Sequence, residues 1–368
     1  MRKIFTFLKK EIVLTVSFVL AVVSMFFAPP NNEYLGYIDF RTLGLLFSLM
    51  TIMAGFNKLG VFWLLAENLL GKVKTMRGVT LSLLLLCFFS SMIITNDVAL
   101  ITFVPFTIVI LKLAEKQNRM IFVVTLETIA ANLGSMLTPI GNPQNLYLFS
   151  AYNMSITDFF ITIMPFAMLS LAMLVCFSLF SDKSMIIKTE KREELTFKKK
   201  LLAMYIGLFI VALLSVFRVL NFLILLAVVL TFVLIFDRKV LIKVDYSLLF
   251  TFVFLFIFIG NLGNISQINS WLSSAVDGNE VLVGVLASQV FSNVPAAILL
   301  SGFTNNATTL MIGVNIGGLG TLIASMASLI SFKFIQKESV SIAKYLGIFT
   351  VFNVVFLAAN IILWLVIK

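Results

Sequence analysis

Long apolar segments recur along the whole chain and are separated by short polar or basic stretches. A helix needs about 20 apolar residues to cross the hydrocarbon core of a bilayer. Several segments approach or exceed that length, and we expect each of them to span a membrane. They are residues 11–28, 40–56, 120–149, 159–180, 201–217, 219–236, 246–263, 305–332 and 345–366. Two further apolar stretches, 79–111 and 281–302, contain polar breaks near their middles and need a different interpretation.

The composition agrees with this pattern. The chain is 60% hydrophobic and 12% charged, whereas a soluble domain is about half apolar and about a quarter charged. Such a chain cannot cover its apolar surface in water, so we expect an all-α integral membrane protein whose main partner is the lipid bilayer. The net charge of +10 is explained by basic residues that flank membrane spans, and we expect no nucleic acid as a partner.

Lysine and arginine are distributed unevenly between the loops. If the nine spans alternate in direction, 24 of the 27 basic residues fall on one side of the membrane. Cytoplasmic loops carry such an excess. We therefore expect a multi-pass protein of the cytoplasmic (inner) membrane, with its N-terminus in the cytoplasm and its C-terminus outside. The first apolar run lacks a clear cleavage site, and we expect a retained helix there rather than a signal peptide.

The stretch 281–302 fits this charge map only as a re-entrant hairpin. Its 22 residues are too few to cross twice, and a single crossing would place the basic segment 333–344 outside. We expect a hairpin that enters and leaves from outside, with its tip at residues 292–295. Charge does not decide the case of 79–111, because two crossings and one re-entrant hairpin both return to the cytoplasm.

The two halves of the chain contain matching motifs in the same order. Residues 94–99 (ITNDVA) correspond to 291–296 (FSNVPA), and the NLGS that begins at Asn132 corresponds to the NIGG that begins at Asn315. Upstream, GFNKLG at 55–60 corresponds to GNLG at 260–263. By the charge map, the two spans that end there run in opposite directions. The repeats are therefore expected to be inverted, which is common in secondary transporters.

This symmetry predicts the domain organisation. The first inverted repeat covers residues 1–180, with the hairpin 79–111 and the broken helix 120–149. A cytoplasmic linker follows at 181–200. The second repeat covers 201–368, with the hairpin 281–302 and the broken helix 305–332. By symmetry the first hairpin is also expected to be re-entrant, from the cytoplasm, with its tip at 95–97.

Each hairpin is followed by an apolar segment that polar and helix-breaking residues interrupt. The first interruption runs from Asn132 to Asn145 and the second from Asn315 to Thr321. Two prolines and two glycines within the first one rule out an uninterrupted helix. Half-helix N-termini favour anions, and unwound carbonyl groups favour cations. The alternative is a simple kink with small residues that allow close packing.

Two acidic residues, Asp97 and Glu127, lie within apolar segments and away from loop ends. An ionisable group inside a bilayer is costly and is a candidate for function. Asp97, at a hairpin tip, is a candidate Na⁺ ligand or proton carrier, and its alternative role is the N-cap of the second hairpin helix. Glu127 is expected either to serve in ion coupling or to pair with Lys112 or Arg119 near the inner face.

We expect the hairpin tips and the broken helices to converge in one cleft near the middle of the membrane. The candidate substrate-binding residues are Thr95, Asn96, Asn132, Thr138, Asn142, Asn145, Ser292, Asn293, Asn315, Gly317 and Thr321. The candidate ion-coupling residues are Asn96, Asp97, Glu127, Gly141, Asn293 and Ser325. No Lys or Arg occurs in these motifs, so backbone N–H groups, helix dipoles and a co-bound cation would have to hold an anion there.

Several function classes are not expected. The sequence has no GxxxxGK[ST] nucleotide loop and no histidine, and its two cysteines lie in apolar runs. We therefore expect no enzyme, no cofactor and no metal beyond Na⁺, with Na⁺ or H⁺ as the coupling ion. A channel would need a continuous polar lining rather than two closed hairpins.

Four segments resemble the ion transporter superfamily, and together they span both halves of the chain. They are TNDVALITFVPF (95–106), ANLGSMLTPIGNPQN (131–145), SNVPAAILL (292–300) and GVNIGGLGTLIAS (313–325). The superfamily includes arsenite-efflux permeases, sodium/proton antiporters, citrate–metal symporters and divalent anion/sodium symporters. The resemblance implies that Thr95, Asn96 and Asp97, together with Ser292 and Asn293, hold substrate and Na⁺, as Ser-Asn-Thr tips do in the anion symporters.

The chain departs from that pattern at Asp97 and Val294, where the third tip residue would be Thr. An acid at a carboxylate site repels the substrate, and the Asp form is more similar to the arsenite and sodium/proton branches. The closest likeness is to small anion permeases. We expect an ion-coupled transporter of a small anion or oxyanion that works by an elevator movement. A sodium/proton antiporter is the alternative, a channel is less favoured, and a homodimer is a further expectation.

Overall fold

The computed structural model describes residues 11–31, 34–70, 73–181, 184 and 198–368. Its elements in this part of the chain are all helices. Seven of them are long and apolar enough to cross a membrane. They are α4 (Phe40–Lys58), α6 (Met76–Ile94), α7 (Asn96–Leu113), α10 (Ile156–Ser178), α11 (Lys199–Val216), α13 (Tyr246–Gly263) and α19 (Ile342–Ile367). The expectation of an all-α membrane protein is confirmed.

Two of the expected spans contain shorter helices. The segment 11–28 contains α2 (Ile12–Met25), and 219–236 contains α12 (Phe222–Phe236). At 1.5 Å per residue these helices are about 21 and 22 Å long, which is less than the roughly 30 Å of a hydrocarbon core. The count of nine spans therefore stays a prediction. Most of the predicted linker 181–200 lies outside the described residues.

Both segments that were expected to be broken helices are interrupted as the sequence indicates. In the first, α8 (Met120–Ser135) ends before the interruption and α9 (Pro143–Ala151) follows it. In the second, α17 (Ala307–Ile316) and α18 (Met326–Ile335) are separated by a short 3₁₀ turn, η3 (Leu322–Ala324). Proline cannot donate to the helical ladder, and accordingly α9 begins at Pro143.

Both apolar stretches with polar breaks are helical hairpins. The first consists of α6 and α7, and the second of α15 (Glu280–Phe291) and α16 (Asn293–Ser301). A single residue joins the arms in each case. Its dihedral angles are nearly identical at the two tips, with φ 72° and ψ 151° at Thr95 and φ 74° and ψ 153° at Ser292. Positive φ is uncommon for residues other than glycine, so the two tips share an unusual backbone geometry.

The arms of the two hairpins differ in length. The arms of the second hairpin contain 12 and 9 residues, which corresponds to about 18 and 14 Å of helix. Neither is long enough to cross a bilayer. The arms of the first hairpin contain 19 and 18 residues, and each of them is long enough to cross a bilayer.

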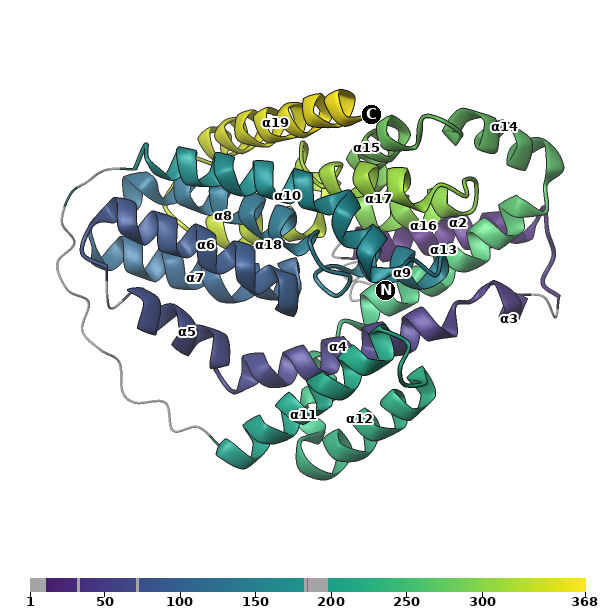
Figure 1. Ribbon diagram of the computed structural model, residues 1–368, viewed down its shortest axis with the longest axis horizontal. Helices are drawn as coiled ribbons and strands as arrows, with labels where there is room; N and C mark the ends of the chain where they lie inside the picture. The colour runs from purple at the N-terminus through teal and green to yellow at the C-terminus, as the bar shows by residue number, and fades with distance from the viewer. Residues whose placement is uncertain (1–10, 32–33, 71–72, 182–183, 185–197) are drawn as a thin grey trace, which may run out of the picture.

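The helices form two groups (Figure 1). The hairpins pack against the broken helices, with α6 on α8, α15 on α17, α7 on α18 and α16 on α9. We call this group, together with α10 and α19, the hairpin bundle. The supporting bundle consists of α2, α4, α11, α12 and α13, and it touches the hairpin bundle where α4 meets α9 and α13 meets α16. Two connecting helices, α5 (Val61–Leu70) and α14 (Ser266–Val276), lead from one group to the other.

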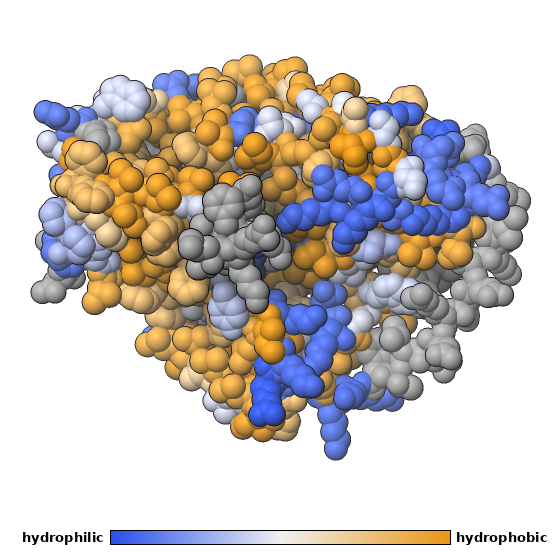
Figure 2. Space-filling view, turned by 180° about the vertical axis from the view of Figure 1, so that it is seen from behind, coloured by the Kyte–Doolittle hydropathy of each residue, from blue (hydrophilic) through white to orange (hydrophobic). Residues whose placement is uncertain are grey.

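Side-chain contacts join basic residues to neighbouring helix ends. Lys112, at the end of α7, lies 2.5 Å from the Glu338 carboxylate beyond α18. Arg77, at the start of α6, donates to the carbonyl of Leu179 beyond α10. In Figure 2, apolar residues cover most of the surface, and hydrophilic residues gather mostly toward the right of the view. This distribution fits a protein whose apolar surface faces lipid and whose ends face water.

Two glycines allow the hairpins to approach the broken helices closely. A Cβ on Gly134 would lie 2.2 Å from the carbonyl oxygen of Phe88 and 2.7 Å from Oγ of Ser91. A Cβ on Gly317 would lie 2.8 Å from Oγ of Ser288. The two serines both stand four residues before a hairpin tip. Small residues at membrane helix interfaces allow this kind of close contact.

We expect Gly134→Ala to destabilise the protein, because the new Cβ would collide with the backbone carbonyl of Phe88, which cannot rotate away. Overpacking of this kind costs about 1–3 kcal/mol. The measurement is the thermal unfolding midpoint of the detergent-solubilised protein. Gly347→Ala on α19 is the control, since its Cβ meets nothing within 4 Å. Equal midpoints for the two variants would contradict the close packing.

Candidate functional site

The tip of the first hairpin is fastened to the broken helix that follows it. The Asn96 side chain donates from Nδ2 to Oδ1 of Asn132 (3.0 Å), and its backbone N–H donates to the carbonyl of Gly141 (3.2 Å). Ser325, from the other broken helix, donates to the same Asn132 oxygen at 3.0 Å. Asn96, Asn132 and Ser325 are all buried. The tip residue Asn96 is therefore joined to both halves of the chain through Asn132.

A second group of amides links the two broken helices directly. Asn142 caps α9, because its Oδ1 accepts from the backbone N–H of Asn145 at 2.8 Å. Its Nδ2 donates to Oδ1 of Asn315 (3.2 Å), and Nδ2 of Asn315 donates to Oδ1 of Asn145 (2.6 Å). Asn145 in turn donates to the carbonyls of Met136 and Thr138. These bonds satisfy carbonyl groups that the interruption of the helix leaves free.

The tip of the second hairpin repeats the local geometry of the first. Oδ1 of Asn293 accepts from the backbone N–H of Val294 at 3.0 Å, as Oδ1 of Asn96 does from Asp97. Ser292 and Asn293 are buried, and a Cβ on Gly318 would lie 2.9 Å from Nδ2 of Asn293. The second tip therefore faces the unwound stretch after α17.

Gln289 is a residue that the sequence reasoning missed. Its Nε2 donates to the carbonyls of Gly317 and Leu319, both at 2.9 Å, and its Oε1 accepts from the backbone N–H of Thr321 at 2.9 Å. Thr321 is thereby held against the hairpin arm and is itself exposed. The available signal was the one amide side chain in a mostly apolar arm, three residues before the tip.

A cavity of about 550 Å³ reaches the first hairpin tip. Thr95, Asp97 and Asn142 contribute polar groups to its wall. Most of the remaining lining is apolar and comes from α4, α7, α13 and the start of α9. Oδ1 of Asp97 has no hydrogen-bond partner within the described part of the chain. Neither Ser292 nor Asn293 contributes to this cavity, so only the first tip is accessible through it.

The N-cap alternative for Asp97 is wrong. Helix α7 begins at Asn96 with Thr95 as its N-cap, so Asp97 lies in the first turn. A carboxylate in that position interacts favourably with the positive end of the helix dipole. Asp97 lines the cavity, and its unpartnered oxygen is itself buried.

The expected pairing of Glu127 with Lys112 or Arg119 is not observed. Glu127 is fully buried between the arms of the first hairpin, where Oε1 accepts from Thr107 Oγ1 at 2.5 Å and lies 3.9 Å from Cys87 Sγ. Lys112 pairs with Glu338 instead. The face of α8 that carries Glu127 packs on the hairpin and turns away from the basic loop. A role for Glu127 in ion coupling stays a prediction.

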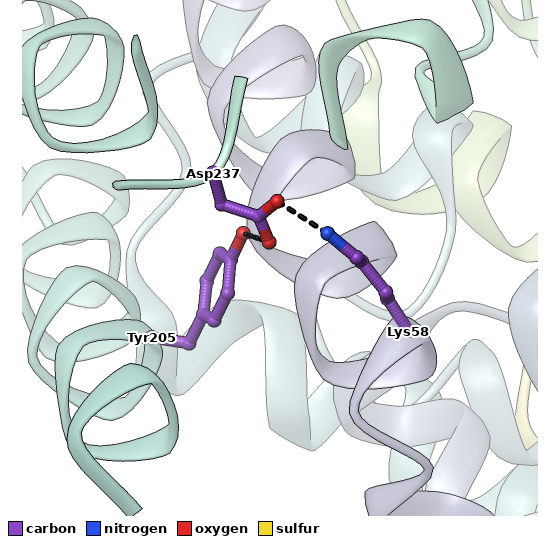
Figure 3. Close-up of polar contacts among 3 residues, drawn as sticks. All are labelled: Lys58, Tyr205 and Asp237. Atoms are coloured by element: carbon purple, nitrogen blue, oxygen red, sulfur yellow. Dashed lines mark hydrogen bonds and ion pairs between the residues drawn. The ribbon is translucent and has the colours of Figure 1, made fainter. Parts of the chain in front are cut away.

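The cavity differs from the expected cleft in its charges. Its wall includes Lys58 and Lys243, which lie outside the hairpin tips and the interruptions of the broken helices. The Lys58 ammonium pairs with the Asp237 carboxylate, and Tyr205 Oη donates to the second oxygen of that carboxylate at 3.0 Å (Figure 3). Arg218 is not part of the lining. Its guanidinium donates instead to the carbonyl of Phe149, near the end of α9.

Comparison with known proteins identifies the family. The sequence profile of the citrate transporter family matches residues 4–313. The chain belongs to the citrate transporter family. The resemblance to the ion transporter superfamily is thereby confirmed, and the chain is a membrane transporter.

Individual relatives agree with this assignment. The chain is 36% identical to the uncharacterized transporter MJ0456 of Methanocaldococcus jannaschii, over 89% of this chain and 90% of that protein. It is 33% identical to the inner membrane protein YbiR of Escherichia coli, over 83% of this chain and 82% of that protein. A shorter match, over 38% of this chain and 29% of the relative, has 33% identity to the silicon efflux transporter LSI3 of rice.

We expect Asn315→Ala to destabilise the protein and to reduce transport. The change leaves the Asn142 amide and the Asn145 carbonyl oxygen without the partner that joins the two broken helices. A buried polar group that loses its partner costs about 1–3 kcal/mol. The thermal midpoint of the purified protein measures the effect. Asn305→Ala is the control, because Asn305 is exposed near the start of the same helix. A midpoint equal to that of the control would show that the link is not needed.

Proposed function

We propose that this member of the citrate transporter family is an ion-coupled secondary transporter of a small anion or oxyanion. The observation that carries the proposal is the cavity at the first hairpin tip, where a carboxylate with an unpartnered oxygen lies beside two helix N-termini. Helix α7 begins at Asn96 and α9 at Pro143, and residues at both starts line the cavity. The helix dipole attracts anions to both N-termini, where the backbone N–H groups of Asn96, Asp97 and Asn145 already have acceptors within the protein.

Asp97 supplies the coupling in this proposal. Its negative charge repels an anion from the two helix N-termini as long as it is uncompensated. Binding of Na⁺ or a proton at Asp97 removes that repulsion, so the cation and the anion bind together. Two hydrogen bonds hold the tip together: the backbone N–H of Asn96 donates to the carbonyl of Gly141, and Oδ1 of Asn96 accepts from the backbone N–H of Asp97. In this proposal the cation site at Asp97 is completed by Thr95, Asn96 and the carbonyl of Gly141.

The arrangement of helices supports an elevator movement of inverted repeats. The hairpin bundle contains both tips and both broken helices, and it meets the supporting bundle along α4 and α13. Corresponding elements of the two halves make corresponding contacts, since α6 packs on α8 as α15 packs on α17. In this proposal the hairpin bundle slides along α4 and α13 and carries the site across the membrane. Both hairpins are re-entrant and the cavity opens to the cytoplasm.

A sodium/proton antiporter is the second candidate. It is favoured by the acidic residue at the tip, together with the lack of basic residues in the hairpin tips and in the interruptions of the broken helices. A ligand-stabilisation screen separates the two candidates, since a ligand that binds the folded state raises its stability by mass action. The thermal midpoint is measured with citrate, phosphate, arsenite and silicate, with and without Na⁺, at pH 6 and pH 8. Stabilisation by an anion that depends on Na⁺ or pH supports the symporter, and stabilisation by Na⁺ alone supports the antiporter.

We expect Asp97→Asn to abolish the cation dependence of transport while the protein stays folded. The amide has nearly the same shape but carries no charge that Na⁺ or a proton would have to neutralise. Uptake of the stabilising anion into proteoliposomes is measured with imposed Na⁺ or pH gradients. Asp158→Asn is a matched control, because Asp158 also lies in the first turn of a helix but is exposed. Wild-type coupling in Asp97→Asn would remove this residue from the mechanism.

The proposed orientation predicts the sidedness of thiol labelling. In a chain with Cys87 and Cys176 replaced, Thr95→Cys should react with a membrane-impermeant reagent from the cytoplasmic side, because Thr95 lines the cavity. Ser292→Cys should be protected from that side, because Ser292 is buried and lies outside the cavity. The comparison uses inside-out and right-side-out vesicles. Labelling of Thr95→Cys from outside only would reverse the proposed orientation.

A further inference from the structure

The cavity wall contains two lysines that come from neither the hairpin tips nor the broken helices. Lys58 is the last residue of α4, and Lys243 is the last residue of the 3₁₀ turn η2 (Arg238–Lys243) that precedes α13. Both lie in the lining together with Asp97 and Asp245. The lysines belong to the supporting bundle, whereas Asp97 belongs to the hairpin bundle. They are therefore attached to the part of the protein that stays in place during the proposed movement.

The charges of the two lysines are compensated to different degrees. Lys58 pairs with Asp237, and Tyr205 holds the same carboxylate from its other side (Figure 3). No ion pair to Lys243 occurs among the residues that the structure describes. The neighbouring Asp245 is occupied as the N-cap of α13, where it accepts from the backbone N–H of Leu248 at 3.0 Å. Lys243 is exposed, so it presents a free positive charge at the cavity.

An anion that enters this cavity needs such a charge. Along the wall it meets the carboxylates of Asp97 and Asp245, and the motif residues around the tip include no cation. A cleft with a cationic group and low-dielectric walls raises the local concentration of anions and their rate of association. The apolar side chains of α4 and α13 that line the cavity provide such walls.

We propose that Lys243, assisted by Lys58, forms an anion-capture site at the mouth of the cavity. A carboxylate or oxyanion binds there first and then passes to the first hairpin tip. This inference rests on the proposed function, because it takes the transported solute to be an anion. Lys243 acts on the encounter with the anion and not on the movement of the hairpin bundle.

The test measures the electrostatic potential of the cavity without any need for transport. Ala54, on α4, lines the cavity and is replaced by cysteine in a chain that lacks Cys87 and Cys176. Its thiolate reacts with methanethiosulfonate reagents of similar size, one bearing a sulfonate and one a trimethylammonium group. The thiolate attacks the reagent's sulfenyl sulfur, a disulfide forms and methanesulfinate leaves. The readout is the ratio of the two rate constants, anionic over cationic.

We expect Lys243→Gln to lower this ratio about fivefold at low ionic strength, because loss of the positive charge slows the anionic reagent and speeds the cationic one. The effect should shrink in 0.5 M salt, where charges are screened over about 4 Å. Lys243→Arg should keep the wild-type ratio. Lys239→Gln is the matched control, since Lys239 is exposed on the same turn but is not part of the lining.

Two results would overturn the capture site. One is an unchanged ratio in Lys243→Gln, and the other is an equal fall in Lys239→Gln.

With citrate as the probe in proteoliposomes, Lys243→Gln should raise KM about fivefold and leave kcat unchanged. A fall in kcat at constant KM would assign Lys243 to the movement instead. If the rate ratio responds to Lys243 while none of the tested anions is transported, the proposed function fails and the anion-attracting mouth remains.

Discussion

A lipid bilayer offers no water to hydrogen-bond a free backbone group, and this constraint shapes the centre of the molecule. Two helices are interrupted within apolar segments, and each interruption leaves carbonyl and N–H groups that a continuous helix would have paired. Buried amide side chains replace the missing partners. Asn145 bonds to carbonyls beyond α8, and Gln289 bonds to carbonyls beyond α17. The broken helices therefore need these buried amides for their own structure, independently of any role of the amides in binding a substrate.

The same amides hold the two halves of the chain together. Asn315, from the second half, bonds to both Asn142 and Asn145 of the first half, and Asn132 joins Asn96 to Ser325. Hydrogen-bonded polar networks in a medium of low dielectric constant make a core rigid, and in this network Nδ2 of the buried Asn132 has no partner within the described residues. The hairpin tips are therefore fixed to the broken helices, and a movement that opens one side is more easily made by the whole hairpin bundle than by a single tip. The one carboxylate in the cavity wall near these amides, Asp97, is left with an unpartnered oxygen.

The two hairpin tips have the same local geometry but different surroundings. Thr95 and Ser292 share the same backbone conformation, yet Thr95 lines a cavity and Ser292 is buried. On the far side of α9, Tyr147 packs against Phe252 and Phe256 of α13, and its hydroxyl lies 2.7 Å from Oγ of Ser301. Tyr147, Phe256 and Ser301 also line a separate cavity of about 380 Å³. The two tips therefore differ in accessibility although their backbone conformations are nearly the same.

The sequence by itself determined the features that depend on local residue types. Apolar length predicted the long helices, and proline and glycine predicted both interruptions, because each follows from the hydrogen bonding and solvation of a short segment. The hairpins were predicted from the length of 281–302, the charge map and the correspondence between the two halves. The tertiary structure decided which side chains meet. Glu127 faces Cys87 and Thr107 rather than Lys112, and Gln289 reaches the unwound stretch near Thr321. Lys58 and Lys243, which are far apart in the sequence, line the same cavity. These contacts join residues far apart in the chain, and their formation depends on how the helices pack against one another.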